Sequence, residues 1–159
     1  MTEPISDPSR EQIDVWHRTF APRAFNHAWS LLDLDEPTRA EEEDMLASTF
    51  AQRYHWYAVG NPRQRAIADW QVSRVAVVLG MADLAKRFGE LSLAECRAND
   101  LDAFVTGFAH EAIARAAAEV DDIETFTDHL EAARQMLAEI EDPEERDTLE
   151  ADLAEMSER

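Results

Sequence analysis

The sequence predicts an all-α fold of about seven helices, arranged as stacked antiparallel hairpins. Apolar residues recur at spacings of three and four, which is the period of an amphipathic helix. The apolar and polar alternation that is typical of strands is nearly absent. The six prolines of the 159-residue chain cluster at the boundaries of the periodic segments. Short connections between helices favour antiparallel packing of neighbours.

The first helix should follow a loose leader, residues 1–7. Asp7 is a suitable N-cap, and Pro8 suits the first helical position because its missing N–H would have no partner there. Pro22 removes a backbone donor and clashes with the preceding turn. We therefore expect a kink or break just before Pro22, followed by helix to about Leu34.

The second helix and the corner after it are marked by capping residues. Thr38 and Glu41 form a capping-box pattern, which predicts a helix start at Thr38. Gly60 should end this helix in the left-handed conformation. Asn61 is a favoured N-cap, and Pro62 fits the first position of the next helix. The two helices must therefore be antiparallel neighbours.

The later helices are bounded in the same way by glycine, asparagine, aspartate and proline. The turn residues are Gly80, Asn99 and Asp100, Asp121 and Asp122, and Asp142 and Pro143. The expected helices cover about 82–98, 101–120, 123–140 and 143–156.

The chain contains an internal repeat. A shift of 41 residues places Arg74 on Arg115 and Gly80 on Asp121. It also places Trp70 on Glu111. A single domain, 1–159, is therefore expected to consist of hairpin units at 22–59, 62–99 and 101–140 and of an acidic capping helix at 143–156.

Small residues at the expected helix contacts resemble those of the tetratricopeptide-repeat class of α-solenoids. These residues are Ser73, Ala85, Ala114 and Ala133, with Gly80 and Asp121 as turn residues. The resemblance covers roughly residues 22 to 140, although the offset of 41 is longer than the 34 of that family. It implies a right-handed superhelix whose concave face, built from the first helix of each pair, binds peptides or partner proteins.

Charge and cysteine content exclude several functions. The formal net charge is −19, from 34 acidic and 15 basic residues, which argues against binding to nucleic acid or to anionic membranes. The single Cys96 permits no internal disulfide and no cysteine-rich metal site. No signal-peptide pattern and no membrane-spanning run is evident, so we expect a cytoplasmic protein.

Motifs of the common enzyme classes are absent from the sequence. His110 and Glu111 begin a zinc-protease pattern, but that pattern needs a second histidine where Ala114 stands. Nucleophile elbows, phosphate-binding glycine loops and dinucleotide fingerprints are also missing. We therefore expect a binding protein rather than an enzyme, with no catalytic residues, no metal and no cofactor.

A candidate binding site consists of polar side chains on apolar helices, with tryptophans as walls. Its members are Asn26, Trp29, Arg53, His55, Trp56, Trp70, Arg74, Glu111 and Arg115. One interpretation is a buried structural network, because buried charges are paired. The other is a groove in which arginines present planar donors to a carboxylate or phosphate.

Three functions remain open from the sequence. The first is a helical-repeat interaction module that binds a partner protein or an acidic peptide through this aromatic and arginine groove. The second is a small-molecule-binding protein or enzyme whose inter-helix pocket uses His55 and Glu111, with a small anionic ligand as one option. The third is a structural subunit that forms a homodimer or larger homo-oligomer.

Overall fold

The structure, a computed structural model, describes residues 7–157, and this part of the chain is all-α with no strand. Of the expected leader, residues 1–6 lie outside the described residues. The helices are α1 (Arg10–Leu32), α2 (Arg39–Val59), α3 (Pro62–Val78), α4 (Ala82–Ala98), α5 (Ala103–Ala118), α6 (Ile123–Leu137) and α7 (Pro143–Ser157). The predicted fold class and the predicted number of helices are therefore confirmed.

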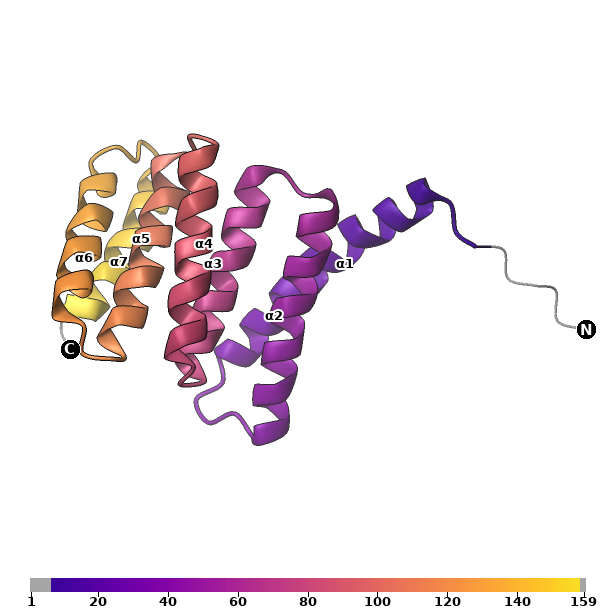
Figure 1. The fold of residues 1–159 in the computed structure, drawn as a ribbon, viewed down its shortest axis with the longest axis horizontal. Coiled ribbons are helices and arrows are strands. Elements are labelled where there is room, and N and C mark those ends of the chain that lie inside the picture. The colour runs from indigo at the N-terminus through magenta and orange to yellow at the C-terminus, as the bar shows by residue number, and fades with distance from the viewer. Residues whose placement is uncertain (1–6, 158–159) are drawn as a thin grey trace, which may run out of the picture.

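Consecutive helices pack in pairs, as Figure 1 shows. The most extensive contacts join α1 to α2, α3 to α4, and α5 to α6. The odd-numbered helices also contact one another in series, from α1 to α3, α5 and α7. The backbones of the even-numbered helices do not approach one another in this way within the described chain, although side chains of α2, such as Phe50, reach Phe88 of α4. The stack therefore has one continuous layer, the odd-helix layer, formed by α1, α3, α5 and α7.

Capping residues set most helix boundaries where the sequence predicted them. Thr38 and Asn61 each form a capping box, and Asp102 and Asp122 each accept a hydrogen bond from a backbone N–H of the first turn. The first helix is different, because Ser9, not Asp7, is its N-cap. Ser9 and Gln12 exchange two hydrogen bonds there, which satisfies two of the backbone groups that a helix start leaves open.

Pro22 does not end α1, so of the kink or break that the sequence predicted, the break does not occur. The helix continues through it from Arg10 to Leu32. A single proline removes one helical hydrogen bond, and the packing of α1 against α2 along its length maintains the helix. Tertiary contacts thus outweigh the local preference.

Gly60 ends α2, but not in the left-handed conformation that the sequence suggested. Its φ of −79° and ψ of 158° are those of extended backbone. The glycine is needed for space instead, because a Cβ at this position would lie 2.5 Å from the carbonyl oxygen of Trp56. The left-handed conformation occurs at Gly80, with a φ of +69°.

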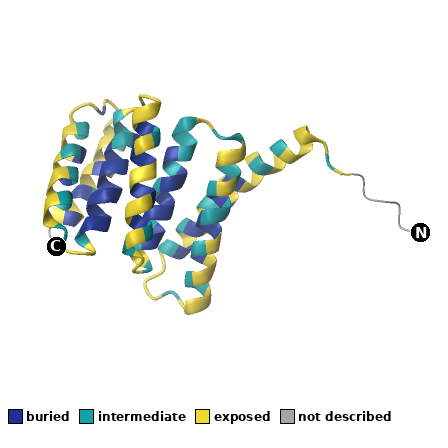
Figure 2. Cartoon of the chain, viewed as in Figure 1, coloured by how far each residue is buried: buried dark blue, intermediate teal, exposed yellow. Residues whose placement is uncertain are grey.

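The core is centred on α5. Every residue from Gly107 to Ala117 is buried, and α5 packs against α3, α4, α6 and α7 (Figure 2). In contrast to α5, the first half of α1 is largely exposed to solvent, with Trp16 and Phe20 each about half exposed.

No helix between residues 7 and 157 combines the length and the apolar character that crossing a membrane requires.

Replacing Gly60 with alanine should destabilise the protein. The added methyl would meet the Trp56 carbonyl oxygen, so the corner between α2 and α3 must open. We expect a loss of about 1–3 kcal/mol in the free energy of unfolding, which is typical of overpacking. Urea denaturation measures it, with Ala58→Ser on the exposed surface of α2 as control. An unchanged midpoint for Gly60→Ala would show that the corner tolerates a side chain.

Candidate functional site

The centre of the site is the carboxylate of Glu111, which is completely buried in α5. Arg115, one turn further along α5, donates a hydrogen bond from Nε to Glu111 Oε1. Trp70 of α3 donates from Nε1 to Oε2 at 3.1 Å. Arg74 Nη1 lies 3.6 Å from Oε1. We call Trp70, Arg74, Glu111 and Arg115 the Glu111 cluster; these are the residues that the 41-residue shift superposes.

Helix α7 adds two acidic residues to this cluster. Glu155 Oε1 lies 3.8 Å from Arg115 Nη1. Burial raises the pKa of Asp152, and the neighbouring Glu111 raises it further, while Arg74 and Arg115 act in the opposite direction. Together with Asp152 and Glu155, the Glu111 cluster thus comprises three carboxylates and two guanidinium groups.

An apolar hollow of about 240 Å³ lies beside the cluster, and all of its walls come from the odd-helix layer. The lining residues are Phe25 and Trp29 of α1, Ile67 and Trp70 of α3, Phe104, Val105 and Phe108 of α5, and Thr148 of α7. The Trp70 ring lies 5.6 Å from the ring of Trp29 and 5.3 Å from that of Phe108. Trp70 thus belongs to both features, with its ring in the hollow and its N–H on Glu111.

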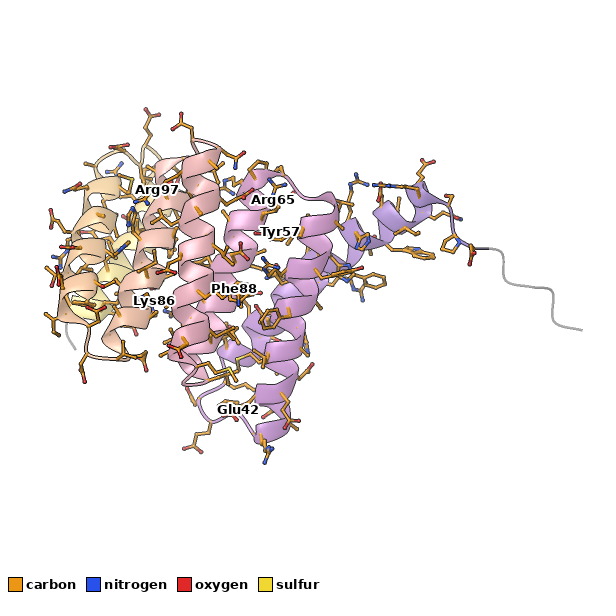
Figure 3. The ribbon with its side chains drawn as sticks, in the orientation of Figure 1. Glu42, Tyr57, Arg65, Lys86, Phe88 and Arg97 are labelled. Carbon is orange, nitrogen blue, oxygen red and sulfur yellow. The ribbon has the colours of Figure 1, made fainter. Side chains whose placement is uncertain are left out.

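The expected site residues of α2 form a different cluster. Arg53 Nε contacts Asp69 Oδ1 of α3 at 2.5 Å, and Tyr57 donates its hydroxyl proton to Asp69 Oδ2 at 2.5 Å. The Arg53 guanidinium also lies over the rings of Tyr57 and Phe88, both labelled in Figure 3. Burial raises the pKa of Asp69, and the hydrogen bonds from Tyr57 and Arg53 oppose that rise. The sequence analysis missed Asp69, because nothing local marks an aspartate that becomes fully buried between helices.

The remaining candidates do not join the Glu111 cluster. Asn26 is exposed on α1, and Trp56 is partly buried near the end of α2. His55 pairs with His17 of α1, with 2.8 Å between the two Nδ1 atoms. Burial, and then the charge of His17, lower the pKa of His55. His55 and Glu111 thus belong to separate clusters, because His55 pairs with α1 and the backbones of α2 and α5 are not in contact in the described structure.

A second histidine pair links α5 to α6. His110 Nδ1 lies 2.9 Å from His129 Nδ1. Burial, followed by the charges of His129 and Arg97, lowers the pKa of His110 to about 4. Sequence reasoning could not find either pair, because the partners are 19 and 38 residues apart. Among the described residues no group of three or more histidine, cysteine or acidic side chains is arranged to hold a metal ion.

A larger cavity of about 430 Å³ lies on the other side of Arg115, between α5, α6 and α7. Its walls include Phe126 and Leu130 of α6, Met156 of α7, and a second arginine, Arg134. Arg115 is 4% exposed, and within the described chain its Nη2 atom has no hydrogen-bond partner. Arg74 Nη1 is likewise buried with no hydrogen-bond partner in the described chain.

Comparison with protein-family models, with curated proteins and with solved structures gave no match for this chain.

Removing Arg115 should destabilise the fold much more than removing Arg74. Arg115→Ala leaves the buried Glu111 without its closest cation, which typically costs about 3–5 kcal/mol. Arg74 is a fifth exposed and lies farther from Glu111, so Arg74→Ala should cost less. Arg39, whose side chain is 90% exposed beside Glu43, is the control, and Arg39→Ala should change stability by less than about 0.5 kcal/mol. Equal and small losses for all three, in urea denaturation, would contradict a structural role for the Glu111 cluster.

Acidification should weaken the protein through His110. The unfolded chain binds a proton at this histidine near pH 6.5, whereas the folded chain binds it only near pH 4. Stability should therefore be lost as the pH falls between these values, by up to about 3 kcal/mol. Comparing the pH dependence of unfolding for the parent and for His110→Gln isolates this contribution. The two profiles should run parallel above about pH 7, and a parallel course at lower pH as well would refute the assignment.

Proposed function

We propose that this protein is a helical-repeat interaction module that binds a segment of a partner protein in the apolar hollow of the odd-helix layer. Its plan is similar to that of tetratricopeptide-repeat proteins, in which the first helices of successive pairs form the binding face. The observation that supports the proposal is the hollow itself, since four helices line it and three of them, α1, α3 and α5, contribute aromatic side chains.

The lining is suited to receive an apolar side chain. Phe25, Trp29, Ile67, Trp70 and Phe104 are only partly buried, so the hollow leaves apolar surface in contact with water. Covering such surface is favourable by roughly 25 cal/mol per Å². Aromatic residues are also enriched in the centres of protein interfaces.

The hydrogen bond from Trp70 to Glu111 prepares the hollow for binding. It fixes the orientation of an indole ring that forms part of the wall. A wall that is already ordered loses little side-chain entropy when a partner binds. The same cluster therefore contributes to the stability of the fold and to the shape of the hollow.

The ion pairs favour a partner-protein segment over the acidic peptide that the sequence also suggested. Arg115 is hydrogen-bonded to Glu111, and Arg74 lies beside the same carboxylate. A carboxylate from a peptide would compete with an internal carboxylate that is already in place. Burial of an apolar anchor requires no such exchange.

The 430 Å³ cavity supports a second candidate function, the binding of a small molecule. Arg115, whose buried Nη2 has no hydrogen-bond partner in the described chain, is one of the residues that line this cavity beside the apolar walls of α6 and α7. A ligand with a hydrogen-bond acceptor and an apolar body would match both features. Saturable stabilisation of the parent, but not of Arg115→Lys, by members of a library of small carboxylates and amides would favour this candidate.

Filling the hollow should abolish binding of the partner segment. Thr148 lines the hollow but is exposed, so Thr148→Phe occupies the space without removing a core residue. Peptides selected from a random phage-displayed library on the parent protein should lose binding to Thr148→Phe by about tenfold or more, which corresponds to about 1.4 kcal/mol.

Thr127→Phe is the matched control. Thr127 is an exposed threonine of α6 whose hydroxyl donates to the carbonyl four residues earlier, as the hydroxyl of Thr148 does. Selected peptides should bind Thr127→Phe as they bind the parent. A library that yields no peptide sensitive to Thr148→Phe would refute the proposed function.

Sedimentation of the free protein tests the remaining function that the sequence left open, a structural subunit of a homo-oligomer.

A further inference from the structure

We infer that the segment bound in the apolar hollow is basic, with an apolar anchor that enters the hollow and with lysine or arginine beside it. This inference rests on the proposed function and adds the charge of the partner. It follows from the charged residues that border the hollow, from the ion pairs among them, and from the acidic character of α7.

Acidic residues outnumber basic residues around the hollow. Side chains three or four residues apart on a helix lie on the same face, so the residues one turn from each lining residue form its border. Within the helices, the acidic border residues are Glu111, Glu144, Glu145 and Asp152, and the basic ones are Arg63 and Arg74. Asp102, the N-cap of α5, adds a fifth carboxylate beside Arg63. The border thus holds five carboxylates and two guanidinium groups. The border residues of α1 include no cation.

Internal ion pairs already occupy both border arginines. Arg63 Nε contacts Asp102 Oδ2 at 3.0 Å, and Arg63 Nη2 lies 3.7 Å from Glu145 Oε1. Arg74 Nη1 lies 3.6 Å from Glu111 Oε1 without forming a hydrogen bond, and Glu111 also accepts a hydrogen bond from Arg115. Both border arginines therefore have an acidic side chain within ion-pair distance, and an anionic segment would only increase the acidic excess.

Helix α7 places acidic side chains on both sides of the hollow. Thr148 lines the hollow, Glu145 lies three residues before it and Asp152 four residues after it. The Glu145 side chain is 42% exposed, and its partner Arg63 also pairs with Asp102. Asp152 interacts electrostatically with the two arginines of the Glu111 cluster, which also interact with Glu111 and Glu155. Cations of a bound segment would meet a carboxylate at both positions.

The net charge of −19 acts in the same direction at longer range. A strongly acidic protein attracts basic partners and accelerates their association, more so at low salt. That long-range attraction alone selects no site, so the apolar hollow must supply the position. The test therefore separates attraction to the whole protein from recognition at the hollow.

Three short peptides serve as probes. The first has a Leu-Phe-Leu centre flanked by lysines, the second has the same centre flanked by glutamates, and the third has the composition of the first with its apolar residues dispersed. The intrinsic fluorescence of the protein reports binding, because Trp29 and Trp70 line the hollow. The first peptide should bind about tenfold or more tightly than the other two at low salt.

Variants of the protein test whether the tighter binding of the first peptide arises at the hollow. Thr148→Phe should remove the preference for the first peptide, and Thr127→Phe should retain it. Glu145→Gln and Asp152→Asn should each weaken binding of the first peptide several-fold. Glu124→Gln and Glu131→Gln remove exposed acids of α6 and should change binding by less than twofold. Because Asp152 is partly buried, the unfolding curve of Asp152→Asn is measured as well, and the more exposed Glu145 provides an independent test.

The outcomes separate the two proposals. Binding of the glutamate peptide that equals or exceeds that of the lysine peptide and that Thr148→Phe abolishes would overturn the basic partner and leave the proposed function intact. Equal binding of the dispersed peptide, or equal weakening by the α6 variants, would overturn the inference in favour of general charge attraction. Binding of no peptide at a site sensitive to Thr148→Phe would overturn both. Self-association of the parent that Thr148→Phe removes would make a second copy the occupant and would also overturn the inference.

Discussion

The structure depends on the buried carboxylate of Glu111. A charge removed from water is tolerated only with hydrogen bonds and opposite charge around it. Glu111 obtains these from Arg115 on its own helix and from Trp70 and Arg74 on α3. The requirement therefore sets how α3 and α5 lie against each other, and it directs the Trp70 ring into the apolar hollow.

The sequence left two interpretations of these residues, a buried structural network and a binding groove, and the Glu111 cluster is compatible with both. As a network, the Glu111 cluster holds adjacent hairpins together within the odd-helix layer. As a scaffold, it shapes a surface that is apolar at its centre and acidic at its border. The arginines are paired internally, so the ion pairs leave the border with an excess of carboxylates. Under the proposal above, the ion pairs that stabilise the fold also set the charge that a partner meets.

Local chemistry explains why most helix boundaries could be predicted. The capping boxes at Thr38 and Asn61 act within four residues, so they operate in nearly any tertiary setting. One error was local, since the Ser9 and Gln12 capping box replaces Asp7 at the start of α1. Two others arose where distant contacts or local space decided the outcome. Packing on α2 carries α1 through Pro22, and the Trp56 carbonyl, not a left-handed turn, requires a glycine at position 60.

The sequence by itself determined the helical class, the hairpin order and, through its repeat, the meeting of Arg74 with Arg115 around one carboxylate. Repeated units place equivalent residues on the same side of a stack, so a shift in sequence predicts closeness in space. Only the tertiary structure decided which other residues meet. Asp69 became buried beside Arg53, and the hollow formed from four helices, because contacts across helices depend on packing that no local pattern encodes.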